Sequence, residues 1–127
     1  MNVVNSSILM KSEPSDKSSL ETECLFGETV EILEECTDWV YCRLNTDNYY
    51  GWVKKKGLGK PINVTHRVIA NRTFIHTDKN PKSKSLFYLP LGAKLLIENI
   101  QSGWAEVSLY DHETKVGYVP SNHIVCI

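Results

Sequence analysis

The 127-residue sequence predicts an all-β protein made of two small β-barrels in tandem. One pattern occurs twice at an offset of 65 residues, so that Trp39 of the first copy aligns with Trp104 of the second. Each copy also alternates apolar and polar residues with the two-residue period of a half-buried strand. Prolines and glycines interrupt every window long enough for a stable helix, so we expect almost no helix.

The first copy begins its strand pattern at residues 29–34, where Val30 and Ile32 fall on one face of the expected strand. After a short polar turn the chain returns through residues 38–44, and this spacing of turn signals is typical of a β-hairpin. The corresponding segments of the two copies are 29–34 with 94–98 and 38–44 with 103–109. The second copy then has one inserted residue, after which 51–53 align with 117–119 at an offset of 66.

The boundary between the copies is predicted at residues 54–61, where a basic and glycine-containing stretch interrupts the strand pattern. We interpret its dense basic run, Lys54, Lys55 and Lys56, as a solvated linker. We therefore expect a first domain at 1–57 and a second at 58–127, and residues 64–70 open the second barrel. Small closed barrels suit such short copies because closure removes exposed strand edges.

Composition places the chain among ordinary globular proteins, with 42% hydrophobic and 23% charged residues. No apolar run approaches the ~18 residues that span a bilayer, and the first residues lack the pattern of a signal peptide. We expect a cytoplasmic protein without a membrane span; the alternative is the cell envelope, if a further segment precedes residue 1. Basic residues do not cluster as nucleic-acid binding requires, so no nucleic-acid partner is expected.

The four cysteines form no Cys-x-x-Cys pair and have no histidine at zinc-ligand spacing, so we predict neither a metal site nor a cofactor. Cys126 and His123 are the one Cys–His pair that is close in sequence. No cysteine lies at a predicted helix start, the setting that would activate a thiol, and buried reduced thiols are the expected state. Catalysis through these cysteines is the least favoured hypothesis.

Four segments of the first copy, in this order and spacing, carry a family resemblance: Ser-Glu-Pro-Ser at 12–15, Leu-Phe-Gly-Glu at 25–28, Asp-Trp-Val at 38–40 and Tyr-Tyr-Gly-Trp-Val at 49–53. The copy resembles the bacterial SH3 domains that occur in tandem before the catalytic domain of NlpC/P60 cysteine peptidases. The nearest likeness is to the γ-D-glutamyl-diamino-acid endopeptidases, also called dipeptidyl-peptidase VI-like. The looser second copy supports the architecture, and the resemblance implies that both barrels are SH3-like.

The peptidase domain of that family has a nucleophilic cysteine in an Asp-Cys-Ser-Gly context and a histidine in a Gly-His pattern, and this sequence contains neither. The resemblance therefore implies a non-catalytic module that contributes to substrate recognition or gating. Its implied partners are an NlpC/P60 peptidase domain, in the same chain or another, and a muropeptide or peptidoglycan stem peptide. The alternative function is a stand-alone SH3-like protein that binds another protein or a peptide in an aromatic groove.

The resemblance also implies that the first domain forms a wall of the substrate cleft, where the free N-terminal amine of a muropeptide is held. By motif position, Glu28 and Tyr49 are the predicted binding residues, because a carboxylate pairs with an ammonium and a phenol gives a directional hydrogen bond. The structural alternative makes Glu28 a solvated residue at a strand start and Tyr49 a loop aromatic. Tyr50 and Trp52 are candidates for an aromatic surface.

Overall fold

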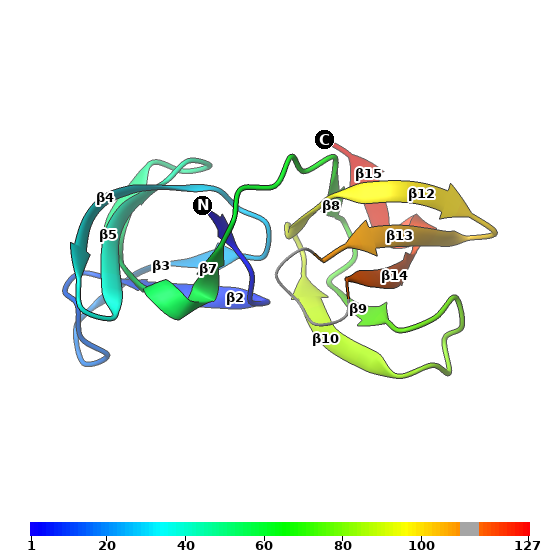
Figure 1. The fold of residues 1–127 in the computed structure, drawn as a ribbon, viewed down its shortest axis with the longest axis horizontal. Coiled ribbons are helices and arrows are strands. Elements are labelled where there is room, and N and C mark those ends of the chain that lie inside the picture. The colour runs from blue at the N-terminus through cyan, green and yellow to red at the C-terminus, as the bar shows by residue number, and fades with distance from the viewer. Residues whose placement is uncertain (110–114) are drawn as a thin grey trace. The chain divides into compact units, whose positions relative to one another are not determined.

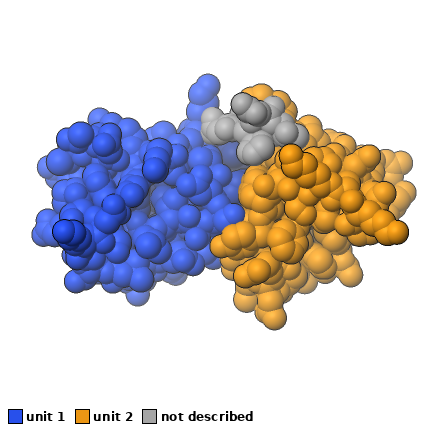
Figure 2. Space-filling view, turned by 90° about the horizontal axis from the view of Figure 1, so that it is seen from below, with its two compact units in different colours: residues 1–62 blue, residues 63–127 orange. Residues whose placement is uncertain are grey.

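The computed structural model describes residues 1–109 and 115–127, and within them the fold is built from β-strands (Figure 1). The predicted all-β class with SH3-like barrels is confirmed. Among the described residues the helical segments are two short 3₁₀ helices, η1 at Lys55–Gly57 and η2 at Ser121–His123. The chain divides into two compact units, residues 1–62 and 63–127 (Figure 2).

The first unit is a five-stranded antiparallel sheet in the order β3-β2-β6-β5-β4, accompanied by a two-stranded pair, β1 with β7. Its strands are β1 Asn2–Val3, β2 Ser7–Lys11, β3 Leu20–Leu25, β4 Val30–Cys36, β5 Trp39–Leu44, β6 Tyr49–Lys54 and β7 Leu58–Gly59. The hairpin expected from residues 29–44 is β4 with β5, and its register pairs Val30 with Leu44.

The second unit repeats this order as β10-β9-β14-β13-β12, with a three-stranded sheet β11-β8-β15 beside it. Its strands are β8 His66–Val68, β9 Arg72–His76, β10 Ser85–Pro90, β11 Lys94–Leu95, β12 Ile97–Gln101, β13 Trp104–Ser108, β14 Val116–Pro120 and β15 Ile124–Cys126. The repeat seen in the sequence is therefore a repeat of strand topology.

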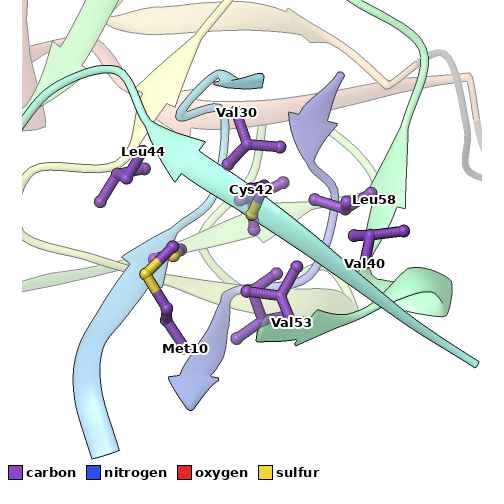
Figure 3. Close-up of a cluster of buried hydrophobic side chains, with 10 residues drawn as sticks. Met10, Val30, Val40, Cys42, Leu44, Val53 and Leu58 are labelled. Atoms are coloured by element: carbon purple, nitrogen blue, oxygen red, sulfur yellow. The ribbon is translucent and has the colours of Figure 1, made fainter. Parts of the chain in front are cut away.

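The core of the first unit comes from alternate residues of its strands, as half-buried strands require (Figure 3). In β5, Val40, Cys42 and Leu44 are buried while the residues between them face outward. The second unit buries residues at the matching repeat positions: Ile75 for Met10, Leu89 for Cys24, Leu95 for Val30, Ala105 for Val40, Val107 for Cys42 and Val119 for Val53.

Two equivalent glycines allow close approach between strands. A Cβ atom added at Gly51 would lie 2.8 Å from the carbonyl oxygen of Lys11 and would also overlap the Met10 side chain. One added at Gly117 would overlap the Cγ2 methyl group of Ile75. Both positions therefore require the smallest residue because of the neighbouring strand.

The segment at residues 54–61, where the boundary and the lysine linker were predicted, contains structure that belongs to the first unit. Lys54 ends β6, η1 follows, and Leu58 and Gly59 pair with Val3 and Asn2. The linker interpretation of these residues is corrected accordingly, because Leu58 is buried and the Val4 amide donates to the Gly57 carbonyl over 3.0 Å. The structure divides the chain after Ile62, whereas the sequence analysis divided it after residue 57.

Candidate functional site

Glu28 lies in the tight turn that leads into β4 and is only 5% exposed. Its Oε1 atom accepts a hydrogen bond from the Leu25 amide over 2.7 Å, and its own amide donates to the Leu25 carbonyl over 3.0 Å. Gly27 between them has a φ of 82°, which glycine adopts without strain. The side chain thus stabilises the turn, and its contact with a ligand stays a prediction.

The second unit explains why this glutamate is needed. At the offset of 65 residues, Leu25 corresponds to Pro90 and Glu28 to Ala93. The backbone bond recurs, from the Ala93 amide to the Pro90 carbonyl over 3.1 Å. Because proline has no N–H group, the second turn has no donor for a carboxylate to satisfy. The first copy therefore has both the donor, the Leu25 amide, and its carboxylate acceptor, Glu28. The second copy has neither, because Pro90 and Ala93 occupy these positions.

Tyr49, Tyr50 and Trp52 all lie on β6, but they divide between two faces because successive side chains alternate. Tyr50 and Trp52 share a face with Tyr41 of β5, whose ring centroid lies 6.4 Å from Tyr50 and 5.3 Å from Trp52. We call these three residues the aromatic face. Tyr49 points to the other side of the sheet and is 45% exposed.

A hollow of about 490 Å³ lies in the first unit at the start of β5, and we call it the Trp39 hollow. It is formed where the loop between β2 and β3, the turn before β5, the end of β6 and η1 meet. Its lining consists of Asp16, Asp38, Trp39, Lys54, Lys55 and Lys56. Sequence reasoning missed this site because it assigned the three lysines to a linker.

Opposite charges meet at this hollow. The Nζ atom of Lys54 is 3.1 Å from Oδ1 of Asp16 and 5.7 Å from the ring centroid of Trp39. Lys55 forms a longer pair with Glu35, 3.8 Å between Nζ and Oε2. All four charged side chains are substantially exposed, so these pairs contribute little to stability. The lysines are therefore free to exchange partners.

A second hollow of about 140 Å³ adjoins the first, because Asp16, Trp39 and Lys54 line both. Its remaining lining residues are Ile8, Leu9 and Lys11 of β2. Lys54 and its ion pair with Asp16 therefore stand between a charged hollow and a more apolar one.

The cysteines differ between core and surface. Burial is the main cause that raises the pKa of the Cys24 thiol to about 12 and that of Cys42 to about 11, from an ordinary 9.0. Cys36 and Cys126 are exposed. All four are free thiols, and the two buried ones are in the unreactive, protonated form at neutral pH.

Cys126 contacts His66 rather than the sequence-adjacent His123. Its Sγ atom is 3.4 Å from His66 Nε2, because β15 pairs with β8, whereas His123 Nδ1 lies 2.8 Å from the Thr73 hydroxyl. Residues 1–109 and 115–127 contain no group of three or more His, Cys, Asp or Glu side chains that could hold a metal ion. Within the same residues, no helix has the length and apolarity to cross a membrane.

One family match and one solved structure agree with this architecture. Residues 10–58 match the family described as the bacterial dipeptidyl-peptidase SH3 domain. A solved structure of an NlpC/P60 family protein from Bacillus cereus is similar over 99% of this chain and 55% of its own, with a TM-score of 0.78 and 15% identity. NlpC2 from Trichomonas vaginalis aligns over 98% of this chain and 46% of its own, with 14% identity and a TM-score of only 0.41.

No curated protein matches the chain. The chain spans about half the length of the Bacillus cereus structure. By fold, then, it falls in the class of proteins built from small SH3-like barrels. Within that class, residues 10–58 match the bacterial dipeptidyl-peptidase SH3 domain, which confirms the resemblance found in that part of the sequence.

Proposed function

We propose that this chain is a non-catalytic pair of SH3-like domains associated with an NlpC/P60 cell-wall peptidase, and that it contributes to recognition or gating of the muropeptide substrate. The observation that carries this proposal is the match of residues 10–58 to the SH3 domain of bacterial dipeptidyl-peptidases. The likeness in fold to an NlpC/P60 family protein supports the architecture. The peptidase domain is the proposed protein partner.

Tyr49 and Glu28 are the residues to test in this role. The Tyr49 side chain is exposed at the start of β6, so its hydroxyl can reach a ligand. The Oε1 atom of Glu28 is occupied by the Leu25 amide, so the proposal assigns its Oε2 atom to the ligand ammonium. A carboxylate of this kind can accept several hydrogen bonds at once.

The experiment is an NMR titration of the full chain with a stem peptide bearing a free N-terminal L-alanine. We expect amide shifts around residues 28 and 49 that weaken in Glu28→Gln, which keeps an acceptor for Leu25 but removes the charge, and in Tyr49→Phe. Tyr50→Phe is the matched control, because this tyrosine faces the other side of the strand. Absence of shifts at millimolar peptide, with and without an added NlpC/P60 domain, would refute the proposal.

A peptide-binding interaction protein is the second candidate, and the aromatic face favours it. Tyr41, Tyr50 and Trp52 gather on one side of the sheet, and Tyr50 is half exposed. Aromatic side chains of this kind receive extended peptides in other small domains. Stem-peptide shifts confined to these three residues would favour the second candidate over the first.

A further inference from the structure

The two units provide an internal control for the Trp39 hollow. In both, the residue that begins the 3₁₀ helix donates its amide to the turn before the Trp strand: Lys55 to the Asp38 carbonyl over 2.8 Å, and Ser121 to the Gly103 carbonyl over 2.9 Å. The backbone scaffold is therefore the same in the two copies.

The side chains on that scaffold differ. The first unit has Asp38, Lys54, Lys55 and Lys56, where the second has Gly103, Pro120, Ser121 and Asn122. Since the second unit forms the same strands and the same helix without any charge, the fold does not require these four charged residues. Trp39 does have a counterpart, Trp104, so the indole is part of the shared framework while the charges are specific to the first unit.

Two of these charges are uncommitted. Within the described residues, the carboxylate of Asp38 and the ammonium of Lys56 have no hydrogen-bond or ion-pair partner. Both line the hollow. An acceptor and a donor are thus available at the same opening, beside the ring of Trp39.

The composition of the lining selects the chemistry of the ligand. A strongly anionic ligand would meet the unpaired Asp38 and a strongly cationic one the unpaired Lys56, and both would gain little from a lining of three lysines and two aspartates. A neutral ligand with many hydroxyl groups can use both charges, donating to the carboxylate and accepting from the ammonium. The volume of about 490 Å³ is in the range of small-ligand sites, about 300–1,000 Å³.

We infer that the Trp39 hollow is a binding site for a short glycan. A sugar ring presents C–H groups that pack against the electron-rich face of Trp39, and its hydroxyls bond to Asp38 and Lys56. Lys54, which now lies over the indole, is held there by an exposed ion pair to Asp16 and moves aside at little cost. This site goes beyond the proposed function, because it recognises sugar rather than the stem peptide.

The test is an NMR titration of the full chain with a β-1,4-linked trimer of N-acetylglucosamine. We expect shifts in the Trp39 indole N–H and in the amides of residues 38, 55 and 56. The double variant Asp38→Ser/Lys56→Asn removes both uncommitted charges and gives position 56 the residue found in the second unit. It should bind the trimer about a hundredfold more weakly, or weaker still, since it removes two hydrogen bonds to charged groups and each contributes about tenfold or more to affinity.

The matched control is Asp47→Ser/Lys82→Asn, which makes the same two substitutions, Asp to Ser and Lys to Asn, at residues that do not line the hollow. Asp47 lies in the turn between β5 and β6, and Lys82 lies in the loop between β9 and β10. It should bind like the parent chain. The inference is overturned if the trimer causes no shift at millimolar concentration, if both double variants bind alike, or if a triglutamate peptide displaces the trimer at lower concentration. A response to the trimer without one to the stem peptide supports this site and refutes peptide recognition; the reverse result does the opposite.

Discussion

The two units reach one topology with different residues, and the pattern of difference separates folding from binding. Buried positions exchange one apolar side chain for another, as Met10 for Ile75 or Cys42 for Val107. Around the hollow, by contrast, the positions that carry charged residues in the first unit correspond to glycine, proline, serine and asparagine in the second. The fold constrains the shape and apolarity of side chains inside the barrel but does not constrain the residues around the hollow. Charged residues that occur around the hollow in one unit and not at the corresponding positions of the other are therefore the ones to examine for binding.

The largest expected effect tests whether the two cores are packed alike. Met10→Ala and Ile75→Ala each remove a fully buried side chain, and each should lower the free energy of unfolding by about 2–5 kcal/mol through lost burial and a residual cavity. Urea unfolding followed by amide signals from both units measures this. A loss under about 1 kcal/mol at either position would contradict equivalent packing.

The paired glycines sharpen the comparison at the backbone. Gly51→Ala should destabilise the chain by about 1–3 kcal/mol because the new methyl group meets the Lys11 carbonyl, which cannot retreat without disturbing the pairing of β2 with β6. Gly117→Ala should cost a similar amount, since its new methyl group would overlap the Cγ2 methyl group of Ile75, which is fully buried and branched at Cβ and so cannot rotate away freely. Thermal unfolding of both variants measures the two losses, and a loss under about 0.5 kcal/mol at either glycine would refute the argument.

The turn before β4 offers a test by exchange between the copies. Glu28→Ala leaves the Leu25 amide without its carboxylate acceptor and should cost about 1–3 kcal/mol, whereas Glu28→Gln retains most of the stability. The double variant Leu25→Pro/Glu28→Ala installs the residues of the second unit and should recover much of the loss. Denaturant unfolding checks this, and a double variant no more stable than Glu28→Ala would contradict the proposed compensation.

The buried thiols predict a pH dependence that only the first unit has. Raised pKa values in the folded state mean that the unfolded chain releases these protons first, so their stabilising contribution is full below pH 9.0 and lost as pH rises through about 11 and about 12. Cys24→Leu/Cys42→Val copies Leu89 and Val107 and should flatten this loss. Urea unfolding at about pH 8 and about pH 10.5 measures it; equal slopes in parent and variant would exclude the thiols as the cause.

Local patterns were sufficient to predict the strands and their repeat, because alternation and turn residues are properties of short segments. Whether Lys54–Lys56 form a linker or a 3₁₀ helix depends on distant residues: η1 is fixed by the Asp38 carbonyl. The meeting of Asp16 with Trp39 likewise requires the folded hairpins. For Glu28, a signal was present in the sequence, since the exchange of Leu25 and Glu28 for Pro90 and Ala93 is visible once the copies are aligned.

Cys36 lies at the end of β4, directly across from Trp39 in the strand register, and is exposed. With Cys24 and Cys42 buried, replacing Cys126 by serine leaves one accessible thiol in the chain. A fluorophore or spin label attached there would sit on the strand beside the Trp39 hollow without entering the core. The protein thus carries its own attachment point for a reporter of occupancy, with which ligand libraries can be screened in real time.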